Sequence, residues 1–500
     1  MRAYKNGLLL AVMAAVSLAL AGAAPAQVKG GFRGAAPAAA APPTRGGGYS
    51  GGGGGGFDGG FATGLAIGVL GAISQSGGQY VDDGTVYEQP GRQPPRRSAR
   101  RSGSGVPPVN ERRYLPDEVV IEVPNSITPQ AIDALERRHR LTRIESQRVQ
   151  LTNTTLFRWR IPDRRSVATV VRALEGDRVV SAAQPNYLFT LQQDSQAKPA
   201  SAPTEGDAAQ YELAKLHLPQ AHAIAKGDNI LVAVIDSGVD ASHPELAGTV
   251  AGTFDTLKQP FQPHFHGTAI AGLIAAHSRL MGAAPAAHIL AARAFDPAGD
   301  SADATTFNIL KSLDWAAANK ARVINMSFAG PSDPAIHRSL MAAYKEGIVL
   351  VAAAGNAGPK SPPLFPAADA EVIAVTATDS DDKLFEQSNR GGYIAIAAPG
   401  ANVLVAAPDA SYQVKSGTSF SAAEVSGIVA LMLQHDPKLK PAAVRTILLA
   451  TARDLGPKGR DNDFGAGLVD AYRAVAEEAA APKVATAVKH RRRHVTSDAE

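Results

Sequence analysis

The chain has 500 residues, of which 45% are hydrophobic and 19% are charged, so it is long enough to form several cores rather than one. Its net charge of +4 is small for this length and gives no indication of a nucleic-acid partner. Cysteine is absent, which excludes disulfides, thiol catalysis and thiolate metal sites.

The first 26 residues have the pattern of an export signal. Two basic residues, Arg2 and Lys5, precede an apolar run that ends near Ala21, and a small-residue cleavage site comes before Gln27. The alternative is a membrane anchor, but neither this run nor any later segment reaches the roughly 20 apolar residues that cross a bilayer. We therefore expect residues 1–26 to be a signal peptide and the protein to be exported to the periplasm, the cell envelope or the medium.

Residues 27–116 are rich in Gly, Pro and Arg and contain too few apolar residues to form a core, which predicts a disordered linker. Within this segment, residues 61–73 are apolar, and glycines recur every four residues at positions 60, 64 and 68. Such spacing allows close contact with a helix or a membrane, but a Gly-rich segment also produces it by chance. Membrane or envelope association through residues 60–73 is therefore one of two interpretations.

Residues 117–191 have the pattern of a small α+β domain. Thr128 and Pro129 are typical of a helix cap and a first helical residue. Alternating and apolar runs predict the order strand, helix, strand, strand, helix, strand, at residues 118–123, 129–139, 145–151, 155–161, 166–177 and 179–189. This order predicts a ferredoxin-like domain, in which two helices cover one face of an antiparallel sheet.

After a polar connector at residues 192–210, residues 211–476 alternate between short apolar runs and helical patterns. The apolar runs have strand length and are nearly continuous, as expected of parallel strands buried on both faces; they lie at residues 229–236, 288–295, 322–328, 348–355 and 371–377. We predict an α/β three-layer sandwich with a mostly parallel sheet, followed by a basic disordered tail at residues 477–500.

Reactive groups in a parallel α/β sheet belong at the carboxyl ends of strands and the amino ends of the following helices. Asp236 ends a predicted strand, His266 opens an apolar helix, and Ser419 opens the helical run at residues 418–434. Taken one at a time, each has an ordinary structural interpretation as a turn residue, a core histidine or a helix cap.

Taken together, these three residues have the chemistry of a nucleophilic hydrolase. A serine hydroxyl needs an imidazole to take its proton, and the imidazolium needs a carboxylate to orient and stabilise it. Acyl transfer also needs a donor for the developing oxyanion, and Asn356, which follows another buried strand, offers a side-chain amide.

Several motifs resemble those of the subtilase family of serine endopeptidases: VAVIDSGVDASHPEL, HGTAIAG, GAAPAAHILAARAF, VINMSFAG, AAAGNAG, SGTSFSAAEVSG and DFGAGLVDAYRAV. The order Asp, His, Ser along the chain is also that of the family. The resemblance covers residues 211–476 and implies a subtilisin-like catalytic domain. More moderately, residues 117–191 resemble the propeptide of the family, which assists folding and blocks the active site.

The resemblance implies a role for each residue. Ser419 is the expected nucleophile, His266 the general base, Asp236 its orienting partner, and Asn356 the oxyanion donor together with the backbone N–H of Ser419. Substrate is expected to pair as an added strand with Ser327, Phe328, Ala329 and Gly330, and Leu364 is expected to line the primary specificity pocket and to make it shallow.

The chain departs from the family pattern at three places. Phe328 and Ala329 replace the commoner Leu and Gly. Ala423, which Glu424 follows, stands where the family usually has a proline in the helix after the nucleophile. Only residues 277–281 lie where many members have a longer calcium-binding loop, so we expect that this metal site is missing and that no cofactor is needed, while a calcium site elsewhere stays open. His264 invites a metal interpretation, but without an acidic partner at ligand spacing a loop histidine is the better prediction.

The expected partners are polypeptide substrates and the chain's own propeptide domain, with cleavage in the connector. The alternative is a catalytically silent scaffold protein with a subtilase fold at the cell envelope; the presence of all four active-site residues favours an enzyme. An esterase is a third possibility, which the Asp-His-Ser order and the absence of Gly-x-Ser-x-Gly around Ser419 argue against.

Overall fold

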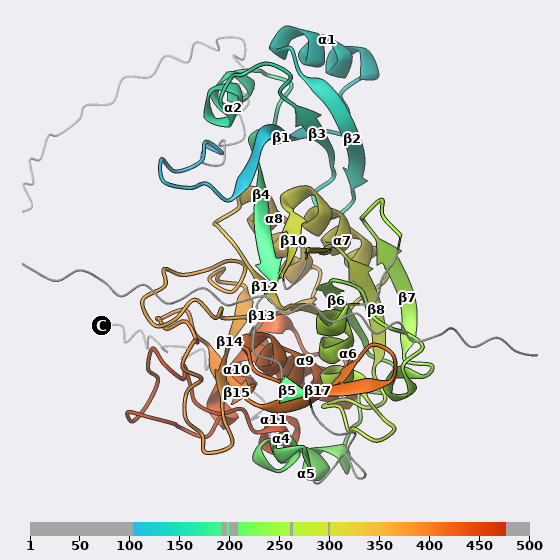
Figure 1. Cartoon of the computed structure of the whole chain (residues 1–500), viewed down its shortest axis with the longest axis vertical. Coiled ribbons are helices and arrows are strands. Elements are labelled where there is room, and N and C mark those ends of the chain that lie inside the picture. The colour runs from blue at the N-terminus through green and yellow to red at the C-terminus, as the bar shows by residue number, and fades with distance from the viewer. Residues whose placement is uncertain (1–103, 192–197, 200–208, 261–263, 299–300, 477–500) are drawn as a thin grey trace, which may run out of the picture. The chain divides into compact units, whose positions relative to one another are not determined.

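The computed structural model of the chain describes residues 104–191, 198–199, 209–260, 264–298 and 301–476 (Figure 1). All of them belong to the same structural unit, which spans residues 94–500. The predicted signal peptide, the Gly-rich segment, most of the linker and connector, and the basic tail lie outside the described residues. Among the helices that the structure does describe, none has the length and apolar character needed to cross a bilayer.

The small domain forms an antiparallel sheet with strand order β2-β3-β1-β4. Its elements follow in the predicted order: β1 (Tyr114–Pro124), α1 (Pro129–His139), β2 (Thr142–Val149), β3 (Thr154–Arg160), α2 (Val167–Glu175) and β4 (Ala182–Leu191). Thr128 and Ser166 cap the two helices, because their side chains accept hydrogen bonds from Ala131 N and Thr169 N. Residues of both helices form one core with one face of the sheet.

The large domain is built on a seven-stranded sheet of order β15-β14-β13-β11-β6-β8-β7, in which every pair is parallel. Its strands are β6 (Leu231–Asp236), β7 (Val250–Asp255), β8 (His288–Arg293), β11 (Val323–Met326), β13 (Val349–Ala353), β14 (Val372–Thr378) and β15 (Ile396–Pro399). Alternate residues of these strands contribute to two different cores, one on each face of the sheet.

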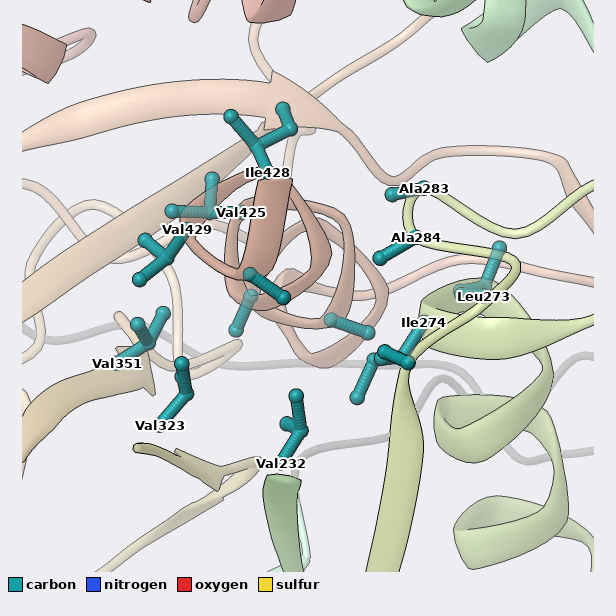
Figure 2. Packing of buried hydrophobic residues seen from close by; sticks show 14 of the residues in the cluster. Val232, Leu273, Ile274, Ala283, Ala284, Val323, Val351, Val425, Ile428 and Val429 are labelled. Carbon is teal, nitrogen blue, oxygen red and sulfur yellow. The ribbon is translucent and has the colours of Figure 1, made fainter. Parts of the chain in front are cut away.

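Helices cover both faces. On one face, α6 (Phe265–Ala275) and α9 (Thr418–His435) pack on Val232, Val323 and Val351, and Figure 2 shows these three side chains on the side of α9 that faces the sheet. On the other face lie α7 (Thr306–Ala318) and α8 (Pro334–Lys345). This arrangement confirms the predicted three-layer α/β fold.

Shorter elements complete the domain. They are α4 (Tyr211–Lys215), α5 (Leu218–His222), the 3-10 turn η1 (Pro244–Leu246), β9 (Asp296–Ala298), β10 (Ser301–Thr305), β12 (Phe328–Ala329), α10 (Pro441–Thr451) and α11 (Ala471–Ala476). A hairpin of β16 (Val403–Ala407) and β17 (Ser411–Lys415), which was not predicted, forms a separate sheet with β5 (Lys198–Pro199).

Two boundaries differ from the predicted ones. The linker was expected to reach residue 116, but β1 begins at Tyr114, because this residue already pairs with Tyr187 of β4. The exposed connector was expected to include Gln210, but this residue is buried, with 3% of its surface exposed. Its side chain accepts a hydrogen bond from Met281 N and donates one to Met281 O, so Gln210 belongs to the packed domain.

Candidate active site

The candidate site lies beside β6, where the chain stops adding strands to one side of the large sheet and begins to add them to the other side. From β6 the chain first builds β7 and β8 on one side, and then β11 on the other side. Asp236 ends β6, and Ser327 follows the end of β11. Ligands of open α/β sheets bind at such a switch point, outside the carboxyl ends of the strands.

Asp236 and His266 form a buried pair. The Nδ1 atom of His266 lies 2.9 Å from both carboxylate oxygens of Asp236, and the two residues are 0% and 1% exposed, respectively. Gly267 makes this approach possible, because a Cβ atom at this position would lie 2.0 Å from Gly238 O. The pair holds Nδ1 toward the carboxylate and therefore directs Nε2 to the opposite side of the ring.

Ser419 lies in the first turn of α9, immediately after Thr418, which begins the helix. Its Oγ donates a hydrogen bond to Ser327 O at 3.2 Å, and among the described residues the structure gives His266 Nε2 no hydrogen-bond partner. Phe420 follows Ser419 and brings its ring to within 6.0 Å of the His266 ring, measured between centroids. The nucleophile candidate and the imidazole are therefore neighbours, and catalytic hydrogen bonds commonly tighten only when substrate is bound.

Asn356 is held by the start of the same helix. Its Oδ1 accepts hydrogen bonds from Thr418 N at 3.1 Å and from Thr418 Oγ1 at 2.8 Å. Thr418 Oγ1 in turn accepts a hydrogen bond from Gly355 N. Since the amide oxygen is engaged, the amide group that can serve an oxyanion is Nδ2. Sequence reasoning missed this role of Thr418, although its place beside Ser419 was a signal.

A buried chain of hydrogen bonds fixes α9 to the sheet beneath it. Ser426 Oγ donates to Asn325 Oδ1, and Asn325 Nδ2 donates to Ser327 Oγ. Ser327 Oγ then donates to Ser419 O at 3.1 Å. The predicted strand residue Ser327 therefore positions the nucleophile as well as the strand.

The predicted substrate strand is paired with the chain's own small domain. Phe328 and Ala329 of β12 pair antiparallel with Leu191 and Thr190 of β4, and β10 pairs with the other edge of β4. Gly330 is needed here, because a Cβ atom would lie 2.3 Å from the ring of Phe189. The strand β4 therefore occupies the place between β10 and β12, and β10 is a part of this groove that sequence reasoning did not identify.

Leu364, the expected pocket residue, is 8% exposed and lies against the AAAGNAG turn, because a Cβ atom on Gly355 would lie 3.0 Å from its Cδ1. The next residue, Phe365, exchanges backbone hydrogen bonds with Gly330. Leu364 is thus brought close to the proposed oxyanion turn, while its effect on specificity stays a prediction.

Polar contacts connect β4 to the amino ends of two helices. Gln184 Nε2 donates to Asp333 Oδ1 at 2.7 Å, and Gln184 Oε1 accepts from Ala335 N at the start of α8. Asn186 Oδ1 accepts from Phe307 N in the first turn of α7. Burial raises the pKa of Asp333, although hydrogen bonds from Thr306, Gln184 and backbone amides act in the opposite direction.

His264 lies in the loop before α6, as predicted, and is the N-cap of that helix. Its Nδ1 accepts a hydrogen bond from His266 N at 3.4 Å and lies 2.9 Å from Ser237 Oγ. The described residues contain no group of three or more His, Asp or Glu side chains that could hold a metal ion.

Residues 277–281, where the family resemblance implied a missing calcium loop, are held by a carboxylate. Glu245 is fully buried and accepts hydrogen bonds from the backbone N–H groups of Ser278, Arg279 and Leu280, each at 3.0 Å. Tyr412 Oη also donates to Glu245 at 2.7 Å. The loop therefore presents N–H donors to the carboxylate, whereas calcium needs oxygen ligands, and the missing calcium site stays a prediction.

Comparison with known proteins agrees with this architecture. The subtilase family profile matches residues 227–467. Thermitase of Thermoactinomyces vulgaris is 34% identical over 274 residues, which make up 53% of this chain and 95% of thermitase. Subtilisin E of Bacillus subtilis (strain 168) is 34% identical over 272 residues, which make up 52% of this chain and 69% of that protein.

Two further relatives extend over more of the chain. The minor extracellular protease Epr of Bacillus subtilis (strain 168) is 34% identical over 329 residues, and the match spans 64% of this chain but only half of the length of Epr. The crystal structure of fervidolysin from Fervidobacterium pennivorans, described as a keratinolytic enzyme related to subtilisin, has a TM-score of 0.62 and 24% identity. It covers 73% of this chain and 61% of fervidolysin, and at this identity it shows the fold alone. The chain therefore belongs to the subtilase family of serine proteases.

Proposed function

We propose that this protein is an exported serine endopeptidase, made as a precursor in which the domain at residues 117–191 blocks the active site. The observation that carries the proposal is the buried pair of Asp236 and His266, with both oxygens 2.9 Å from Nδ1, beside a serine in the first turn of α9. An oriented imidazole next to a serine is the arrangement that activates a hydroxyl for acyl transfer.

In this mechanism, Ser419 Oγ attacks the carbonyl carbon of the scissile peptide bond, and its proton moves to His266 Nε2. Asp236 orients the ring and stabilises the imidazolium. Asn356 Nδ2 and the backbone N–H of Ser419 stabilise the oxyanion. The imidazolium then protonates the leaving amine, and water, activated by the same histidine, releases the acyl group from Ser419. No cofactor takes part in these steps.

Polypeptides are the proposed substrates, because the groove has the geometry of strand addition. Both β10 and β12 present edges to a strand between them, and β4 fills this position. Main-chain pairing of this kind binds extended peptides with little dependence on their side chains. Substrate residues are therefore expected to replace β4 after it leaves.

The blocking role of the small domain rests on the same pairing and on the polar contacts of Gln184 and Asn186 with the two helices. Cleavage within residues 192–210 separates this domain from the catalytic domain in the proposal. Export rests on the signal pattern of residues 1–26 and on relatives such as Epr, which is named an extracellular protease. Association of residues 60–73 with the envelope stays a separate hypothesis.

The test compares the chain from Gln27 with its Ser419→Ala variant. Each is followed by intact mass, by casein hydrolysis and by labelling with a serine-directed fluorophosphonate. We expect the wild type to shorten to a start within residues 192–210, to digest casein and to take up one label at Ser419, while the variant stays full length, inactive and unlabelled.

If both proteins stay intact and neither reacts, even after limited treatment with a glutamyl endopeptidase that can cut the connector after Glu205, the endopeptidase proposal is wrong. The chain would then be the catalytically silent scaffold with a subtilase fold. The added protease is included because a requirement for removal of the small domain by another protease would otherwise imitate that result.

A further inference from the structure

A second histidine is connected to the Asp236 and His266 pair by a single hydroxyl. Ser237 Oγ lies 3.0 Å from Asp236 Oδ1 on one side and 2.9 Å from His264 Nδ1 on the other. The same Oγ accepts a hydrogen bond from Gly267 N at 3.3 Å. Three parts of the site, the end of β6, the N-cap residue of α6 and the first turn of that helix, therefore meet at Ser237.

The hydroxyl of Ser237 has one proton and two acceptors within reach. Nδ1 of neutral His264 accepts the hydrogen bond from His266 N, so it carries a lone pair and no proton. In this state the Ser237 hydroxyl can donate to either His264 or Asp236. When His264 is protonated, Nδ1–H must donate to Ser237 Oγ. The hydroxyl proton is then directed to Asp236 Oδ1, which already accepts a hydrogen bond from Ser237 N at 2.7 Å.

The charged surroundings decide where His264 titrates. Burial lowers the pKa of His264, and the neighbouring His266 and Lys415 act in the same direction, while Asp236 opposes them. Lys415 places its Nζ 4.1 Å from the centroid of the Phe265 ring, and that ring lies 4.8 Å from the His264 ring. His264 is therefore neutral at pH 7 and gains its proton only in acid.

We propose that His264 is a positioning residue that acts through Ser237 on the carboxylate of Asp236 and adds a second proton-dependent step to the acid limb of activity. The inference rests on the proposed protease function. Acylation moves a proton from Ser419 to His266 and creates one cation beside Asp236. If His264 is already protonated, a second cation lies in the same cluster and repels the imidazolium of His266. The Ser237 hydroxyl then also donates to the Asp236 carboxylate, which weakens the stabilisation that Asp236 gives to His266. Both effects oppose acylation.

The test is the pH dependence of kcat/KM between pH 4 and pH 9. The self-processed full chain is used with fluorescent casein, and each rate is divided by the active-site concentration from fluorophosphonate titration. In the wild type we expect the slope of log kcat/KM against pH to approach two at the acid end. In the His264→Asn variant, whose amide oxygen can still cap α6 and accept from Ser237, we expect a slope of one.

Two further variants isolate the connection. Ser237→Ala removes the hydroxyl but keeps both histidines, and we expect its acid slope to fall to one as well. His222→Gln is the matched control, since burial also lowers the pKa of His222, whose Nε2 bonds to Ala283 O away from the site. We expect this control to keep the slope of two.

A wild-type slope of one, or a slope of two that survives in His264→Asn, would overturn the role of His264. A slope that drops in His264→Asn but not in Ser237→Ala would overturn the route through Ser237. Failure of the wild type to react with fluorophosphonate at any pH would instead contradict the protease function. If a variant does not process itself, the rate of its labelling after a glutamyl endopeptidase has cut the connector at Glu205 gives the same pH profile.

Discussion

At the scale of single residues, the amide of Asn356 is placed by Thr418 rather than by its own turn alone. Both hydrogen bonds of Thr418 engage the amide oxygen, so the orientation of the amide is set by the first residue of α9. The proposed oxyanion donor and the proposed nucleophile therefore depend on the same helix start. This coupling makes the amide a rigid donor, which is the condition for stabilising charge that appears only in the transition state.

Replacement of Asn356 by Ala should lower kcat by about 10²–10³-fold with little change in KM, because the lost donor acts on the transition state and not on bound substrate. Steady-state kinetics of the processed enzyme, with kcat expressed per titrated active site, measure this effect. Asn319→Ala, at the exposed end of α7, is the control and should leave kcat unchanged. A change in kcat of less than about threefold in the Asn356 variant would contradict its role.

The four central residues could be predicted from the sequence because each stands in a local motif at the end of a strand or the start of a helix. The role of His264 could not, because its partner Ser237 is distant in the chain and only the approach of α6 to β6 brings them together. The predicted loop position of His264 agrees with the structure, but its capping contact was not predicted, although a polar residue before a helix start is a capping signal.

At the scale of elements, α9 carries a second feature besides the nucleophile. Glu424 of α9 and Glu212 of α4 are 2% and 0% exposed, and Gln210 Nε2 donates a hydrogen bond to Glu212 Oε1 at 3.2 Å. Burial raises the pKa of Glu212 to about 7, and burial together with the charge of Glu212 raises the pKa of Glu424 well above its usual value. The two groups therefore fit the fold best when at least one of them is protonated.

The free energy of unfolding should consequently fall with rising pH. Because the folded-state pKa values lie above the value of 4.5 for the unfolded chain, the folded state binds more protons, and the stabilisation present below pH 4.5 is lost as pH rises toward 7 and above. Glu424→Gln should flatten this slope and stabilise the protein by about 1–3 kcal/mol at pH 8.

Urea unfolding of the Ser419→Ala background at pH 5 and pH 8 measures both quantities and avoids self-digestion. Glu386→Gln, which removes the same charge from an exposed site, is the control and should keep the pH dependence of the parent. Equal slopes for the Glu424 variant and its parent would show that the pair does not titrate in this range.

The elements of the small domain and five of the seven strands of the large sheet could be predicted, because those parallel strands are continuous apolar runs and Thr128 and Ser166 give clear helix starts. The strands β7 and β15 were not predicted. The insertion of β4 between β10 and β12 could not be predicted. Pairing between residues 190 and 303 is a long-range contact, and the residues of β10 carry no strand pattern of their own. The hairpin at residues 403–415 was missed for want of a Gly-containing turn signal.

At the scale of the whole molecule, the two domains share more than the pairing of strands. One core contains Val120 and Leu156 from the free face of the small sheet together with residues of α7 and α8. Ion pairs join Arg338 to Glu122 and Lys311 to Glu145 across the same interface. The small domain thus binds the catalytic domain by an apolar centre with a polar border.

Gln184→Ala should weaken this association by about tenfold. Asp333 is 3% exposed and accepts from the Gln184 amide, so the variant leaves a buried acceptor and the amide of Ala335 with fewer partners. After self-cleavage, the processed mixture is diluted stepwise, and protease activity is expected to appear at about tenfold higher protein concentration than in the wild type. Gln130→Ala, on the exposed side of α1, is the control.

A dilution curve that coincides with that of the wild type would mean that Gln184 contributes only to folding and not to retention of the small domain. An activity that never appears on dilution, in either protein, would mean that the two domains stay together after cleavage.

The loop at residues 277–281 has a consequence for where such a protein can work. Its shape is set by the carboxylate of Glu245, which is part of the chain itself, so three backbone N–H groups of the loop find their acceptor within the protein. With no cysteine in the chain, the redox potential of the surroundings has no disulfide to act on.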